Sequence, residues 1–209
     1  MGQNTMKQEE KTGLTKERIL QAAMQEFGTN GYAASTLNTI CSDHAISKGL
    51  LYHNFAGKDG LYLACVARCF SDVTEHLEAN GIPDDLENYM HMRLQYFSGH
   101  PHHARIFFEA MLQPPAALSA QIRDLRKDFD LLNRKIYQAA LSKVTLREGV
   151  TEADAIAYYE IMQVMFNGYF SSPAYAKKDF QVLVKDHEQW LSKMLNLMLY
   201  GIGEKRIQK

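Results

Sequence analysis

Apolar side chains recur at helical spacing along almost the whole chain, and this feature restricts the fold more than any other. Near the amino end, Ile19, Ala23 and Phe27 are spaced so that they share one face of a helix. No segment shows the sustained alternation of apolar and polar residues that is typical of a half-buried strand. The pattern therefore predicts an all-α protein.

Clusters of glycine, proline and serine divide this pattern into about nine predicted helices. Thr15 suits the N-cap of the first helix, which we expect to end at the run from Gly28 to Gly31. The predicted helices cover residues 15–27, 36–43, 47–55, 58–76, 84–98, 102–113, 117–146, 151–170 and 180–201.

Composition places the protein among ordinary globular chains. The 209 residues carry a formal net charge of −1, so no whole-molecule field draws the protein onto a polyanion. Three cysteines, an odd number without paired spacing, favour a reducing cytoplasm. The amino terminus lacks the apolar core of a signal peptide, and the most apolar stretch, residues 194–202, is far shorter than the ~20 residues of a membrane span. We therefore expect a cytoplasmic protein that is neither exported nor embedded in a membrane.

Residues 15–55 have the layout of a helix-turn-helix: an amphipathic helix, then two short helices joined by a tight turn. In such a motif the second short helix enters the major groove of DNA. Leu51 and Phe55 are four residues apart and can anchor this helix to the core, leaving its other side chains toward the nucleic acid. Between His44 and Lys58 there are two lysines, two histidines and no acid. The neutral-to-basic window of a balanced chain thus coincides with the expected docking surface.

The residue pattern of this segment resembles the amino-terminal domain of the TetR family of bacterial transcriptional regulators over about residues 13–72. The residues that carry the resemblance are Thr15-Lys16-Glu17-Arg18-Ile19-Leu20-Gln21-Ala22-Ala23, Phe27, Gly31-Tyr32, Thr36, Ile40, Ser47-Lys48-Gly49, Leu51-Tyr52-His53, Phe55 and Lys58. The resemblance implies a three-helix DNA-binding domain over 13–72 and a helical ligand-binding and dimerisation domain over 73–209. It also implies a homodimer that binds a palindromic operator in double-stranded DNA and, most often, acts as a repressor released by a small effector.

Ten residues are the predicted DNA-binding set. By resemblance, phosphate contacts fall to Thr36, Tyr52, His53 and Lys58, and groove-facing positions to Asn38, Lys48, Gly49 and Leu50; the layout adds Ser47 and Asn54. Three residues depart from the usual family pattern. Ala45 stands in the turn where glycine is usual, and a left-handed alanine costs about 1 kcal/mol. Leu50 can only pack on a base, for example on a thymine methyl, and Asn38 offers an amide suited to adenine.

The carboxy-terminal segments are rich in aromatic and methionine residues, which suit both a core and an apolar pocket. We predict a pocket for a largely apolar or aromatic effector, with Arg93, Arg105 and Glu109 as possible polar anchors. Its predicted lining is Tyr89, Met92, Tyr96, Phe107, Met111, Tyr137, Met162, Met165 and Phe166. The last helix has a wide apolar face that includes Trp190, Leu195, Leu197 and Met198, which exceeds what one subunit needs and predicts dimerisation through residues 151–201.

Two other functions compete with a DNA-binding regulator. An enzyme is the weaker alternative, because the sequence has no nucleophile elbow, glycine-rich phosphate loop or zinc-protease motif, and we expect no catalytic residues and no cofactor. A helical partner-binding module that has lost DNA affinity is the other, given the departures at Asn38, Ala45 and Leu50. The pair Cys65 and Cys69 suits buried packing better than a redox switch, and His91, His100, His102 and His103 suit a helix start better than a metal site.

Overall fold

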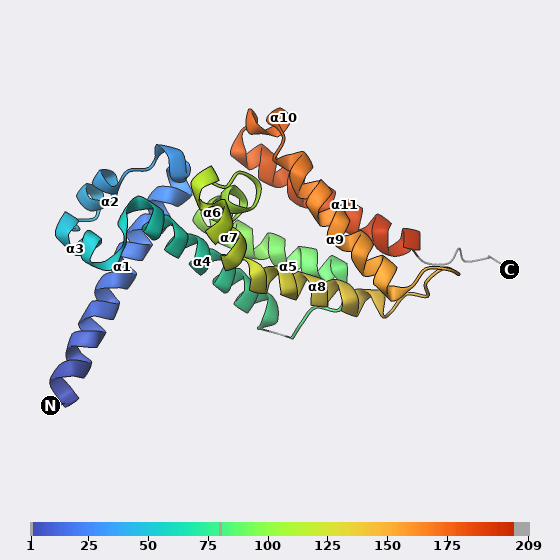
Figure 1. Cartoon of the computed structure of the whole chain (residues 1–209), viewed down its shortest axis with the longest axis horizontal. Helices are drawn as coiled ribbons and strands as arrows, with labels where there is room; N and C mark the ends of the chain where they lie inside the picture. Colours follow the sequence, from blue (N-terminus) through green and yellow to red (C-terminus); the bar gives the residue numbers. More distant parts are fainter. Residues whose placement is uncertain (1, 80, 203–209) are drawn as a thin grey trace. The chain divides into compact units, whose positions relative to one another are not determined.

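A computed structural model describes residues 2–79 and 81–202, and the all-α prediction is confirmed for them. Figure 1 shows the arrangement. In place of the nine expected helices, the described residues form eleven α-helices and one 3₁₀-helix, η1. The elements are α1 Gly2–Ala34, α2 Leu37–Asp43, α3 Lys48–Asn54, α4 Gly57–Glu78, α5 Leu86–Gly99, α6 Pro101–Leu112, η1 Ala116–Leu118, α7 Ser119–Leu125, α8 Lys127–Leu141, α9 Glu152–Phe170, α10 Pro173–Ala176 and α11 Phe180–Ile202.

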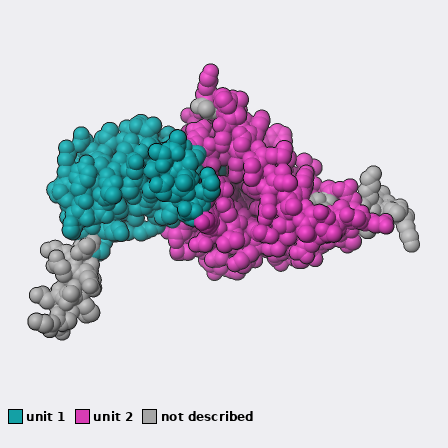
Figure 2. Space-filling view, in the orientation of Figure 1, with its two compact units in different colours: residues 1–69, 100–110, 114–125 teal, residues 70–99, 111–113, 126–209 magenta. Residues whose placement is uncertain are grey.

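The chain forms two compact units, coloured separately in Figure 2. Unit 1 contains residues 1–69, 100–110 and 114–125, and unit 2 contains residues 70–99, 111–113 and 126–209. Segments distant in sequence thus contribute to the unit that carries α1, α2 and α3. The division into domains over 13–72 and 73–209 stays a prediction.

Unit 1 is built around the apolar face of α1. Ile19, Ala23 and Phe27 are fully buried there, together with Leu51 of α3 and Leu61 of α4. The predicted end of the first helix, in the run from Gly28 to Gly31, corresponds to a kink: Gly31 has non-helical angles, φ 77° and ψ 170°, and the helix continues beyond it to Ala34. Glycine adopts this conformation without the steric cost that a Cβ adds.

Unit 2 is a helical layer structure in which α11 packs against α5 and α9, and α8 packs against α5 and α9. The single helix predicted over 117–146 is wrong: η1, α7 and α8 occupy that range, and α8 ends at Leu141. The break falls at Arg126, and the short α10 begins with Pro173, whose fixed φ suits the first turn of a helix. Among the described helices, none combines the length and apolarity that crossing a lipid bilayer requires.

Candidate nucleic-acid interface

The first short helix of the motif, α2, begins at a side-chain cap. Thr36 has extended backbone angles, and its hydroxyl accepts a hydrogen bond from the Thr39 N–H at 3.0 Å. Such a cap satisfies a donor that the first turn of a helix leaves unpaired. Ile40 and Cys41 are buried and attach α2 to unit 1, while Thr36 and Asn38 are exposed.

The turn between α2 and α3 contains the one described non-glycine residue with a positive φ, Ala45 at 50°. The turn therefore keeps the left-handed conformation although its alanine has a Cβ. Arg18 of α1 supports it, because one guanidinium nitrogen donates to the carbonyl oxygens of His44 at 2.8 Å and Ala45 at 3.2 Å. Ile46 is buried directly after the turn and fixes the entry to α3.

The predicted recognition helix is α3, and only one side of it is buried. Ser47 caps it, accepting from the Leu50 N–H at 3.2 Å. Leu51 is fully buried, as predicted, and Phe55 is buried at the C-cap. On either side of Leu51, Leu50 is 37% exposed and Tyr52 is 60% exposed. Exposed apolar and aromatic side chains beside lysine and histidine are suited to base edges and phosphates.

The predicted DNA-binding residues come from α2, α3 and the start of α4, and most of them face solvent. Eight are exposed: Thr36, Asn38, Ser47, Lys48, Gly49, Leu50, Tyr52 and His53. Asn54 and Lys58 are half-buried. The Asn54 amide donates to the Leu50 carbonyl at 2.8 Å, so it stabilises the end of α3. The Lys58 ammonium lies 4.4 Å from the centre of the Tyr32 ring. Their roles toward DNA stay predictions.

Two residues that support this interface were not among the predicted site residues. Arg18 holds the turn, and Tyr32 contacts Lys58. Both belong to the sequence pattern that carries the family resemblance, which was the available signal. Their contacts join segments separated along the chain by 26 residues in each case, counted from Arg18 to His44 and from Tyr32 to Lys58.

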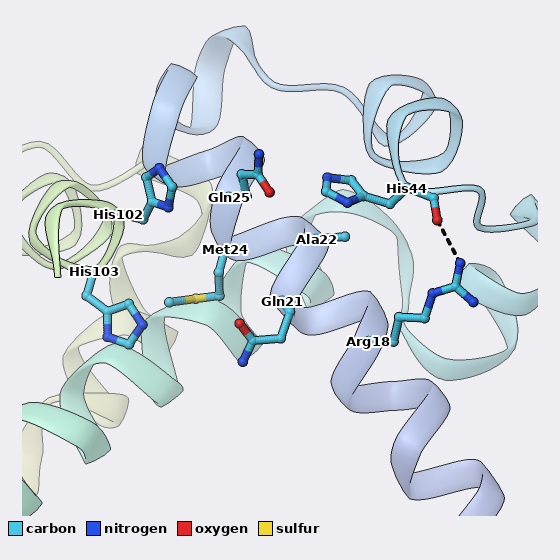
Figure 3. A pocket seen from close by; sticks show the side chains of 8 residues that line it. All are labelled: Arg18, Gln21, Ala22, Met24, Gln25, His44, His102 and His103. Atoms are coloured by element: carbon cyan, nitrogen blue, oxygen red, sulfur yellow. Dashed lines mark hydrogen bonds between the residues drawn. The ribbon is translucent and has the colours of Figure 1, made fainter.

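A cavity of about 490 Å³ lies beside the turn in unit 1 (Figure 3). Arg18, with its bond to the His44 carbonyl, forms one side of it, and α6 contributes two histidines. The pKa of His103 is lowered to about 4. Burial is the largest cause, and the neighbouring His100, Arg68 and His102 lower the pKa further. The cavity is lined by Arg18, Gln21, Ala22, Met24, Gln25, His44, His102 and His103.

The described residues contain no group of three or more histidine, cysteine or acidic side chains placed to hold a metal ion. All three cysteines are buried, and none of them forms a disulfide within the described residues. Burial raises the pKa of the Cys65 thiol far above its ordinary value, which keeps the sulfur protonated and poorly reactive.

The predicted effector-lining residues fall into three groups. Buried in unit 2 are Tyr89, Tyr96, Tyr137, Met162 and Phe166, with Met92 and Met111 half-buried. Phe107 belongs to unit 1 instead. Met165 is 70% exposed on α9 and is not brought together with the buried set. Tyr137 and Tyr159 stack with ring centres 4.3 Å apart, and the buried Tyr137 hydroxyl has no hydrogen-bond partner in the structure.

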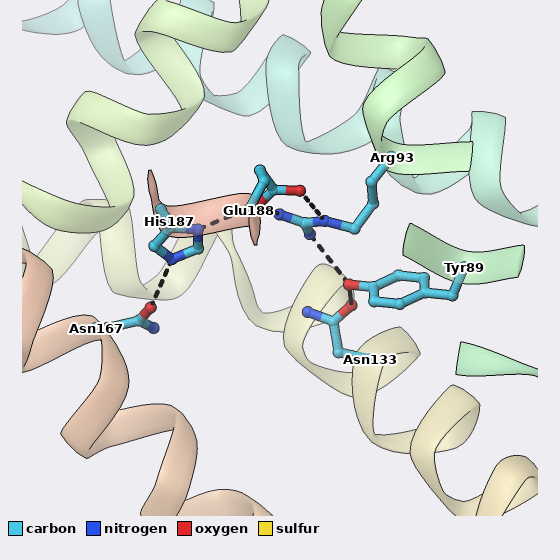
Figure 4. A network of polar contacts seen from close by, with 6 residues as sticks. All are labelled: Tyr89, Arg93, Asn133, Asn167, His187 and Glu188. Carbon is cyan, nitrogen blue, oxygen red and sulfur yellow. Dashed lines mark hydrogen bonds and ion pairs between the residues drawn. The ribbon is translucent and has the colours of Figure 1, made fainter. Parts of the chain in front are cut away.

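A buried polar network crosses unit 2 beside these aromatic residues (Figure 4). Arg93 of α5 forms a two-point ion pair with Glu188 of α11, at 2.7 and 3.1 Å. Arg93 also donates to the Tyr89 hydroxyl at 3.0 Å, which donates to Asn133 at 2.7 Å. His187 lies 3.1 Å from Glu188 and 3.3 Å from Asn167. The predicted anchor Arg93 is thus engaged within the protein.

The polar anchors Arg105 and Glu109, predicted for the effector, lie in unit 1. Glu109 accepts hydrogen bonds from the Tyr32 N–H and the Tyr62 hydroxyl, and Arg105 approaches the Asn30 carbonyl at 3.5 Å. Both side chains therefore contact the segment around the kink of α1.

Unit 1 contains a helix-turn-helix. The motif consists of the short helix α2, a tight turn and the capped helix α3, which has one exposed side. Residues 19–65 match the family model described as bacterial regulatory proteins, tetR family. This part of the chain is therefore similar to the amino-terminal region of bacterial regulatory proteins of the tetR family.

Curated relatives support this assignment over part of their length. The chain is 29% identical over 94 residues to the HTH-type transcriptional repressor SCO4008 of Streptomyces coelicolor, covering 45% of this chain and 48% of that protein. It is 42% identical over 52 residues to the HTH-type transcriptional regulator UidR of Escherichia coli, covering 25% of this chain and 26% of that one. The chain thus spans half or less of the curated relatives it matches.

Solved structures resemble about nine-tenths of the chain in fold. The transcriptional regulator FadR of Bacillus subtilis, solved with stearoyl-CoA, has a TM-score of 0.61 at 18% identity, covering 89% of this chain and 98% of that one. A tetR-family protein from Rhodococcus has a TM-score of 0.57 at 20% identity, covering 91% and 98%.

Proposed function

We propose that the protein is a DNA-binding transcriptional regulator, a repressor that a small effector releases from a palindromic operator. The capped, half-exposed helix α3 on a tetR-family module carries this proposal. Lys48, Gly49 and Leu50 are the groove-facing residues of that helix, and Asn38 reaches bases from α2. Phosphate contacts come from Thr36, Tyr52, His53 and Lys58.

The protein acts as a homodimer through α9 and α11, which pack side by side in unit 2 (Figure 1). Both helices expose large apolar side chains that one chain leaves uncovered. On α9 these include Ile161, Val164 and Met165, exposed by 58, 74 and 70%, and on α11 they include Trp190 and Leu197, exposed by 50 and 64%. Exposed apolar surface of this kind marks an association site.

The effector is an apolar or aromatic small molecule that binds in unit 2, next to Tyr137 and Phe166. The unpartnered Tyr137 hydroxyl supports this placement, because a buried polar group without a partner is unfavourable until a ligand supplies one. The FadR neighbour was solved with stearoyl-CoA, which has a long apolar chain.

Selection of bound duplexes from a random DNA pool tests the proposal. We expect a palindromic consensus whose half-sites are about one helical turn apart, with affinity that falls as salt rises. Lys58→Ala should weaken binding evenly across sequences and reduce the salt dependence, whereas Lys48→Ala should also change the preferred bases. A wild-type dimer that enriches no sequence would contradict the proposal and favour a partner-binding module.

A further inference from the structure

Glu109 of α6 is a half-buried carboxylate of unit 1, and its hydrogen bonds connect α6 to α1 and α4 of that unit. Its two oxygens accept from the backbone N–H of Tyr32 at 3.1 and 3.0 Å. The Tyr62 hydroxyl of α4 donates to the same carboxylate at 3.1 Å. Charge-assisted bonds of this kind are stronger than those between neutral groups, so Glu109 fixes the main chain at Tyr32.

The kink of α1 makes this contact possible. Gly31, just before Tyr32, has φ 77°, and a Cβ there would lie 2.9 Å from both the Arg105 guanidinium and a Glu109 oxygen. A glycine therefore provides both the backbone angle and the space that the carboxylate needs. The N–H of Tyr32 points at Glu109 because the helix turns away at this residue.

The side chain of Tyr32 faces the start of α4, where the predicted phosphate contact lies. Its hydroxyl donates to Asp59 at 2.5 Å, and the Lys58 ammonium lies 4.4 Å from its ring centre. The Tyr62 ring packs against it at 4.8 Å. Tyr32 is thus held at its main chain by Glu109 and itself orients Lys58 through a cation–π contact.

We propose that Glu109 is a positioning residue for DNA binding, which holds Tyr32 so that the Lys58 ammonium is placed for a phosphate. The proposal rests on the DNA-binding function proposed above. Glu109 touches no DNA in this account and acts only through Tyr32. Its predicted role as an effector anchor is replaced by this one.

A charge effect and a positioning effect of Glu109 change DNA affinity in opposite directions, so one variant distinguishes them. Removing an acid from a unit that binds a polyanion raises affinity if charge alone matters. If Glu109 positions Lys58, Glu109→Ala should instead lower specific affinity by about tenfold, the scale of one hydrogen bond to a charged group. The control is Glu17→Ala, which removes an acid of the same unit that pairs with Arg68 at 2.8 Å, and it should leave affinity unchanged or raise it.

Two further variants separate positioning from general damage to the fold. Glu109→Gln retains an oxygen for the Tyr32 N–H and should keep affinity within about threefold of wild type. In a Lys58→Ala background, Glu109→Ala should cause less than about twofold further loss, since both changes remove one contact. Losses that multiply in the double variant, or an affinity for Glu109→Ala equal to or above wild type, would overturn the proposal.

Amide hydrogen exchange tests the same contact without DNA. The Tyr32 amide should exchange slowly in wild type and Glu109→Gln and rapidly in Glu109→Ala, while helix content by circular dichroism stays the same. Unchanged protection of Tyr32 in Glu109→Ala would overturn the positioning role. A wild-type protein that binds no duplex would refute the proposed function instead, and the exchange result would still decide the role of Glu109.

Discussion

The ion pair between Arg93 and Glu188 should make unit 2 sensitive to acid. Burial alone raises the pKa of the Glu188 carboxyl, but Arg93 and His187 outweigh it and lower that pKa to about 2 from its ordinary 4.5. The unfolded chain therefore takes up the proton at higher pH than the folded one, so acid favours unfolding. The interaction stabilises the fold fully above pH 4.5, and its contribution disappears as the pH falls toward 2.

The magnitude follows from the shift. The pKa of Glu188 falls from 4.5 to about 2, which corresponds to about 3 kcal/mol of folding free energy at 1.36 kcal/mol per pKa unit. By pH 3.5 about 1 kcal/mol of this should be lost. Because Glu188 is only 9% exposed, solvent does little to screen the interaction.

Urea unfolding at pH 7 and pH 3.5 measures this contribution, with the fluorescence of Trp190 as the probe. Trp190 is the only tryptophan and lies on α11, so its signal reports on unit 2. Glu188→Gln should be less stable than wild type at pH 7, and the difference in unfolding free energy should shrink by about 1 kcal/mol at pH 3.5. The control Glu75→Gln, an exposed acid on α4, should change stability by less than about 0.5 kcal/mol. A difference for Glu188→Gln that stays constant between the two pH values would refute the reasoning.

Three further changes test other parts of the structure. Ala45→Gly should raise the free energy of unfolding by up to about 1 kcal/mol, because glycine removes the strain of the positive φ. Thermal unfolding followed by circular dichroism measures this change, and a lower melting temperature in the variant would contradict the prediction. Gly28→Ala should lower the melting temperature by several degrees, since its Cβ would lie 2.6 Å from the Cα of His102, whereas Gly13→Ala, in open space, should not. Val164→Glu should give a folded monomer in analytical ultracentrifugation, because Val164 is 74% exposed in the single chain; a dimer as tight as wild type would exclude α9 from the interface.

The sequence predicted the helix-turn-helix within one or two residues. Helices expected over 36–43 and 47–55 are Leu37–Asp43 and Lys48–Asn54. The reason is local: Thr36 and Ser47 are capping residues, and each makes its cap bond within three residues of its own position. The burial of Leu51 was equally predictable from helical spacing.

Features that depend on contacts between distant residues could not be predicted from the sequence. The break between α7 and α8 falls at Arg126, where no glycine or proline marks it. The contact between Tyr32 and Glu109 joins residues 77 apart, so no local pattern could indicate it. Helical periodicity also does not tell a face buried within the subunit from one left exposed. Leu195 and Met198 were expected at the dimer interface, yet they are only 2 and 3% exposed in the single chain.

The rotation of α11 about its axis decides which of its apolar residues remain outside. With about 100° between successive residues, Leu191, Leu195 and Met198 lie on the same side of the helix as Glu188. All of these are buried, whereas Trp190 and Leu197 lie about 180–200° away and are exposed. The ion pair with Arg93 thus lies on the buried side of α11, opposite Trp190 and Leu197.

This geometry links the buried network to dimerisation. Replacing a buried ion pair with apolar residues of similar volume is often neutral for stability, while the polar pair adds specificity in some proteins. We expect the double variant Arg93→Met, Glu188→Leu to keep a folded, helical unit 2 but to dimerise at least about tenfold more weakly, because apolar packing alone permits α11 to rotate. Sedimentation equilibrium measures the dimer constant, with Leu197→Glu as the reference for a disrupted interface. A double variant that dimerises as tightly as wild type would show that Leu191, Leu195 and Met198 set the rotation without the ion pair.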